Sequence, residues 1–84
     1  MEKKKQSREI LSNQYSFESV YPNIARWVMD GWIEIGNESY TDSFVRALDE
    51  GGMVWEGKSK YPMLEDALRD LDRGIAEWFE ENDG

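Results

Sequence analysis

Acid–base chemistry in this chain must rest on carboxylates, because its 84 residues include no histidine and no cysteine. The first absence removes the commonest general base and metal ligand, and the second removes thiol catalysis and the usual zinc ligands. Adjacent carboxylates remain, among them the pairs Asp49–Glu50 and Glu65–Asp66. Neighbouring side chains on a strand or a helix point in different directions, so we interpret both pairs as solvated charges. We expect no enzyme, no catalytic residue, no cofactor and no metal site.

A glycine-rich stretch, ALDEGGMVWEG at residues 47–57, is the other candidate for a ligand site. A phosphate-binding loop places its glycines between a strand and a helix, with a lysine nearby. Here a strand-like run follows the two glycines, and two carboxylates precede them. Paired glycines also supply the positive φ angles that tight hairpins need. We therefore predict a β-hairpin with Leu48 opposite Met53 or Trp55, and the ligand loop stays the alternative.

The predicted hairpin would gather apolar side chains on both faces of a sheet. One face would carry Phe44, Leu48, Met53 and Trp55, and the other Val45, Ala47 and Val54. Since two helices cover one face well and the other poorly, we expect an exposed aromatic face, as protein-binding and dimer surfaces have. Phe44, Arg46 and Trp55 are its candidate partner-binding residues, with Arg46 and Trp55 as a cation–π pair. The alternative is that the N-terminal residues fold across this face.

The elements that would position these residues follow the order α-β-β-β-α. Pro22 suits the first turn of a short helix, and Gly31 is placed where that helix would stop. WIEIG, at residues 32–36, predicts a first strand before the hairpin. Residues 62–81 predict a long helix, because apolar side chains recur there at helical spacing. The order predicts an α+β fold, a three-stranded antiparallel meander with the helices on one face.

Two features of the long helix call for a reason beyond helix stability. Gly74 in its interior costs about 1 kcal/mol relative to alanine, so we expect it to let another element come close. Acidic residues at the C-terminal end oppose the helix dipole. They are either solvated charges or a surface that recognises a basic partner. The candidate residues for such recognition are Asp70, Glu77, Glu80 and Glu81.

Length and charge indicate one small acidic domain. Residues 1–19 read as a flexible or loosely docked tail, and residues 20–84 as the domain. The net charge is −8, divided as +1 over residues 1–20 and −9 over residues 21–84. A surface with this balance repels phosphate backbones, so we expect no direct nucleic-acid binding. No apolar run approaches the roughly 20 residues that span a bilayer, and the absence of cysteine favours the cytoplasm.

Residues 43–81 resemble the N-terminal strand–strand–helix unit of HicB-type antitoxins. The motifs that carry this resemblance are Phe44 to Leu48, Gly51-Gly52, Met53 to Gly57, Glu65-Asp66-Ala67-Leu68, Ile75 and Trp78. The chain departs from the family in having DEGG where a proline-rich turn is typical, and no DNA-binding segment. The whole chain is also similar to small uncharacterised bacterial proteins of about this length, which brings no function.

We therefore expect a small acidic non-enzymatic protein-interaction module. It would bind a protein partner through the acidic C-terminal helix, the aromatic sheet face or both. The resemblance implies an antitoxin-like role, and the acidic charge of the chain favours a partner with a basic face. The alternative is a structural or accessory subunit of a larger assembly, or a homodimer that uses the same sheet face.

Overall fold

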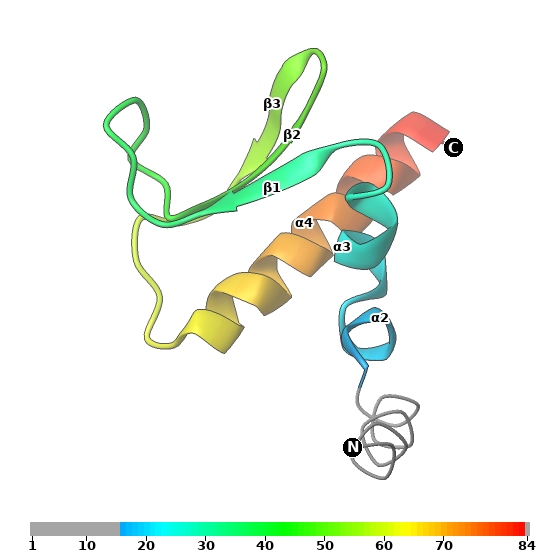
Figure 1. The fold of residues 1–84 in the computed structure, drawn as a ribbon, viewed down its shortest axis with the longest axis horizontal. Helices are drawn as coiled ribbons and strands as arrows, with labels where there is room; N and C mark the ends of the chain where they lie inside the picture. The colour runs from blue at the N-terminus through cyan, green and yellow to red at the C-terminus, as the bar shows by residue number, and fades with distance from the viewer. Residues whose placement is uncertain (1–15, 84) are drawn as a thin grey trace, which may run out of the picture.

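The computed structural model describes residues 16–83, with the side chains of residues 16–82. It confirms the predicted α+β order and adds one short helix (Figure 1). The elements are α2 (Phe17–Val20), α3 (Pro22–Trp27), β1 (Trp32–Ile35), β2 (Val45–Asp49), β3 (Gly52–Glu56) and α4 (Leu64–Asp83). Of the expected tail, residues 1–15 lie outside the described part of the chain, and residues 17–19 belong to α2.

Each N-terminal helix begins with an identifiable stabilising contact. The Ser16 hydroxyl caps α2 by accepting the backbone N–H of Ser19 at 3.1 Å. Pro22 occupies the first turn of α3. The free N–H groups that follow it, those of Asn23 and Ile24, both donate to Oδ1 of Asp72 at 2.9 Å. Because Asp72 lies on α4, the long helix supplies the cap that α3 lacks in its own sequence.

The three strands form an antiparallel sheet in the order β1-β2-β3. The predicted hairpin is confirmed, with Leu48 opposite Met53 and with Gly52 at a φ of +116°. One part of the prediction is wrong, because Ala47 pairs with Trp55 and leaves Val54 as an extra residue in β3. This bulge shifts the side-chain pattern by one position. Trp55 therefore lies on the face of Ala47, not on the face of Leu48 and Met53.

The long helix α4 packs beneath β2 and β3 (Figure 1). Trp55 lies directly on Gly74, and a Cβ atom at residue 74 would lie 2.2 Å from Cε2 of the indole. The expectation that this glycine admits another element is confirmed. The buried core between the sheet and the helices consists of Tyr21, Ile24, Trp27, Val45, Ala47, Ala67, Leu71 and Ile75.

A second close approach fixes α3 against the sheet. The indole N–H of Trp27 donates to the carbonyl oxygens of Trp32 and Leu48, both at 3.1 Å. Gly31 makes room for this arrangement, since a Cβ there would lie 2.5 Å from the Leu48 oxygen and 2.8 Å from the indole nitrogen. The turn between α3 and β1 therefore depends on a residue without a side chain.

Candidate functional site

The structure does not bring Phe44, Arg46 and Trp55 together on an exposed face. Trp55 contacts α4 at Gly74. Phe44 is half-buried, and its ring lies 6.2 Å from that of Tyr61, with both residues packed against the core. The expectation of one exposed aromatic face made by these residues is wrong. For Trp55 the reason is the bulge in β3, which turns its side chain to the helix side of the sheet.

Arg46 is the most deeply buried charged residue among those described, with 1% of its surface exposed. Its guanidinium donates to the carbonyl oxygens of Ser43 at 2.6 Å and Gly36 at 3.0 Å, and it pairs with Glu34 at 3.0 Å. Its cation–π contact is with Tyr40, at 5.6 Å, instead of Trp55. Arg46 therefore holds the loop of residues 36–43 against the outer face of the sheet.

The carboxylate of Glu34 completes this cluster on the outer face. The Tyr40 hydroxyl and the Arg46 guanidinium both donate to Glu34 Oε1. The Tyr40 hydrogen bond, followed by the Arg46 hydrogen bond, lowers the pKa of Glu34 below its ordinary value. The same contact with Glu34 raises the pKa of Tyr40. Glu34 is thus held as an anion on β1, with 33% of its side chain exposed.

The four acidic candidates on α4 divide into two groups. Asp70 accepts the Tyr61 hydroxyl at 2.5 Å and pairs with Arg73 at 2.6 Å. Burial acts to raise the pKa of Asp70, but these hydrogen bonds outweigh it and lower the pKa. Glu77 pairs with the other side of Arg73 at 2.8 Å. Glu80 and Glu81 are exposed near the end of the helix, and together with Glu77, whose side chain is 59% exposed, they form the accessible part of the predicted acidic surface.

Exposed apolar side chains occur on several elements, and two of them, those of Trp32 and Ile35, lie on β1. On the outer face of the sheet, Trp32, Leu48 and Met53 form a row across all three strands. Trp32 is 47% exposed and Met53 42%, while Leu48 between them is buried. The sequence had indicated Leu48 and Met53 for an exposed face. It missed Trp32, although WIEI already showed that Trp32 and Glu34 share a face.

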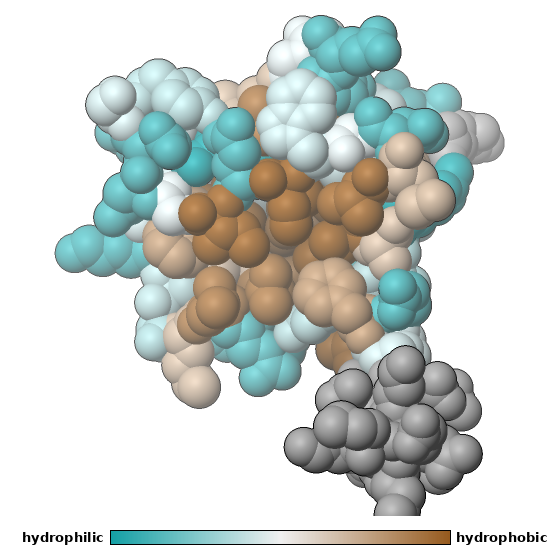
Figure 2. All heavy atoms as spheres, in the orientation of Figure 1, coloured by the Kyte–Doolittle hydropathy of each residue, from teal (hydrophilic) through white to brown (hydrophobic). Residues whose placement is uncertain are grey.

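The opposite side of β1 is also incompletely covered. Pairing places Ile33 and Ile35 on the helix side, with Ala47 and Val45. Because α4 packs under β2 and β3, it leaves the neighbouring strand exposed, and Ile35 is 42% accessible. Hydrophobic residues gather in the middle of the face seen in Figure 2, where Figure 1 shows β1 running above α4. We call Trp32, Ile33, Ile35 and Met53 the β1 surface.

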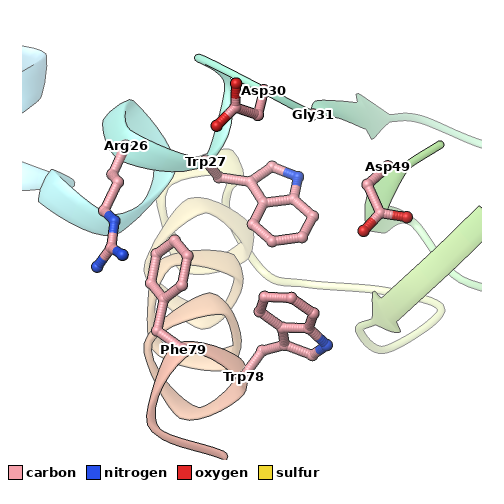
Figure 3. A pocket seen from close by; sticks show the side chains of 7 residues that line it. All are labelled: Arg26, Trp27, Asp30, Gly31, Asp49, Trp78 and Phe79. Carbon is pink, nitrogen blue, oxygen red and sulfur yellow. The ribbon is translucent and has the colours of Figure 1, made fainter. Parts of the chain in front are cut away.

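A cleft of about 260 Å³ lies between α3, the end of β2 and the C-terminal part of α4 (Figure 3). Its walls include Trp27 and Trp78, whose rings meet edge to face at 5.1 Å. The carboxylates of Asp30 and Asp49 also line it. Aromatic faces and carboxylates attract cations. The cleft is smaller than the roughly 300–1,000 Å³ of typical small-molecule sites, and its own Arg26 already supplies a cation, with the guanidinium 3.9 Å from the centre of the Phe79 ring.

The comparisons with known proteins do not assign this chain to a family. No model of a protein family, no curated protein and no solved structure matches the chain. Within residues 16–83, no helix is long and apolar enough to cross a membrane. Nor do three or more acidic side chains in this part of the chain gather as they would around a metal ion.

Proposed function

We propose that this chain is a non-enzymatic protein-interaction module that binds a protein partner at the β1 surface. The observation that carries the proposal is the exposure of large apolar side chains on both faces of one strand. Trp32 is 47% exposed on the outer face and Ile35 42% on the helix side. Exposed apolar groups gathered in this way are typical of protein–protein contacts, in which aromatic anchors dominate the binding energy.

The charge of the domain bears on the kind of partner. Residues 21–84 carry −9, so a partner with a basic face would be attracted before contact. Glu80 and Glu81 at the end of α4 are exposed and available for such an encounter. An antitoxin-like role, in which the module covers a basic partner, is a concrete form of this proposal. We favour a protein partner over a small ligand, because the cleft is small and the β1 surface is open.

Tagged co-purification from the native host, with bound proteins identified by mass spectrometry, tests the proposal. We expect a stoichiometric partner that survives a high-salt wash if apolar contact with the β1 surface dominates. Trp32→Glu should release it. Met29→Glu is the matched control, since Met29 is 80% exposed and lies outside the sheet. A double change, Glu80→Gln with Glu81→Gln, tests whether the acidic end of α4 contributes.

Three results would count against binding of a partner at the β1 surface. A chain that purifies without a stoichiometric partner at low salt would remove its main support. Release of the partner by Met29→Glu but not by Trp32→Glu would place the contact elsewhere. If only the change at Glu80 and Glu81 releases the partner, the acidic end of α4 is the binding site instead of the β1 surface.

A further inference from the structure

The free edge of β1 presents backbone groups that are ready for pairing. In an antiparallel pair, successive residues direct their N–H and C=O groups alternately toward and away from the neighbouring strand. The N–H of Gly57 donates to the Val45 oxygen, and the N–H of Gly36 donates to the Phe44 oxygen. The register of β1 on β2 then directs the backbone groups of Ile33 and Ile35 away from β2. No other segment of residues 16–83 pairs with this edge.

The other edge of the sheet is protected in a way that β1 is not. β3 contains the bulge at Val54 and begins with Gly52 at positive φ. Bulges interrupt the regular ladder that an added strand needs, and natural proteins use them to block edge pairing. The pairing of β1 with β2 is regular over all four residues, and β1 contains no lysine and no proline. Strand addition is therefore favoured at β1.

Charge argues against a second copy of this chain as the added strand. In an antiparallel pair of two copies, the outward backbone groups of Ile33 and Ile35 are all used in only one register. That register places Ile33 of each copy opposite Ile35 of the other. That register sets Glu34 opposite Glu34 of the other copy, at the close spacing of a non-hydrogen-bonded pair. Like charges directly opposite each other destabilise a sheet. Each copy also carries a net charge of −8.

We propose that β1 binds an extended, basic segment of a partner protein by strand addition. The inference rests on the proposed function and specifies the mode of binding and the chemistry of the partner. Side chains of the added strand opposite Ile33 and Ile35 lie on the helix side, beside uncovered apolar surface, and are apolar. The side chain opposite Glu34 lies on the outer face and is lysine or arginine. The recognised pattern is apolar–basic–apolar with period two.

The probe for this proposal is a short amidated peptide in which lysine and valine alternate. It is titrated into the isotope-labelled full chain, and backbone amide shifts are followed by NMR. We expect the largest shifts at Ile33, Glu34 and Ile35, and slower hydrogen exchange at the two isoleucine amides once the peptide is bound. A peptide that alternates glutamate and valine should not bind, because its charge matches that of the domain.

Proline at residue 35 separates backbone pairing from apolar contact. Ile35→Pro deletes one outward N–H, and edge strands tolerate proline at such positions. The hydrogen bonds between β1 and β2 do not use this N–H, so the fold should persist. Unchanged amide shifts in α4 would show that it does. We expect a loss of about tenfold in affinity for the lysine–valine peptide. Ile35→Val keeps the N–H and should stay within about twofold. Glu34→Gln should weaken binding about two- to fivefold by removing the charge.

Several outcomes overturn the inference. Equal binding of the two peptides removes the charge argument, and unchanged binding by Ile35→Pro removes the backbone pairing. If the amides of Ile33 and Ile35 are already protected from hydrogen exchange in the free protein, another segment occupies the free edge of β1. Protection that grows with protein concentration identifies a second copy, and protection independent of concentration identifies this chain's own N-terminal residues. A native partner that Trp32→Glu releases and Ile35→Pro does not would leave the proposed function standing and refute only strand addition.

Discussion

The contact between Gly74 and Trp55 makes a helix-stabilising substitution destabilising. In an exposed helix, glycine to alanine gains about 1 kcal/mol. Here the new Cβ would lie 2.2 Å from Cε2 and 2.4 Å from Nε1 of the Trp55 indole, far inside van der Waals contact. Overpacking of this kind costs about 1–3 kcal/mol, and a rigid ring placed so close favours the upper end. We expect Gly74→Ala to lower the free energy of unfolding by about 2 kcal/mol.

The sign of the effect should reverse once the indole is gone. Trp55→Leu removes the ring atoms that the new Cβ would meet. In that background Gly74→Ala should stabilise the protein by up to about 1 kcal/mol, the helix-propensity gain. The coupling between the two sites is then about 3 kcal/mol, within the range for residues in direct contact. Urea unfolding followed by far-UV circular dichroism gives all four free energies without relying on tryptophan fluorescence.

Two results would refute this reasoning. Gly74→Ala could stabilise the protein that retains Trp55, which would mean that the indole does not rest on the helix at this residue. Alternatively, Gly74→Ala could have the same effect with tryptophan or leucine at residue 55. That outcome would show that any loss has a cause other than the contact. A domain of this size should shift its melting temperature by about 4–8 °C per kcal/mol, so a thermal scan provides an independent check.

Three further predictions concern the contacts that hold the site in place. Gly31→Ala should destabilise the protein by about 1–3 kcal/mol in urea, because its Cβ would lie 2.5 Å from the Leu48 oxygen; an unchanged midpoint would contradict the close approach. Asp72→Ala should cost about 0.5–2 kcal/mol through the lost cap of α3, with Asp72→Asn in between, and a neutral Asp72→Ala would contradict the cap. The pKa of Asp70 is lowered from 3.8 in the folded protein. Its contribution to the free energy of unfolding is therefore present above pH 3.8 and is lost as the pH falls through the folded-state pKa. The unfolding free energy should therefore fall less steeply below pH 3.8 in Asp70→Asn than in the original chain; equal slopes would contradict the lowered pKa.

The sequence was sufficient for features set by local spacing. Helical periodicity and the paired glycines predicted α4 and the hairpin, and an interior glycine predicted a close approach to α4. Contacts between distant residues left no comparable signal. Asp72 falls on the polar face of its helix, and only tertiary structure reveals that it caps α3, 48 and 49 residues away. The burial of Arg46 depends on the loop of residues 36–43, whose path no spacing rule describes.

The error over Trp55 and the proposal for β1 have the same physical origin. A hairpin without a bulge would have placed Trp55 on the outer face with Leu48 and left β3 as a regular edge. The extra residue Val54 instead turns the indole toward Gly74. It also interrupts β3 as a template for another strand. The bulge thus contributes an aromatic side chain to the core and leaves β1 as the regular edge among the described strands. Deleting Val54 would keep Ala47 opposite Trp55 and Leu48 opposite Met53, so the indole should stay over Gly74 while β3 becomes a second regular edge of the sheet.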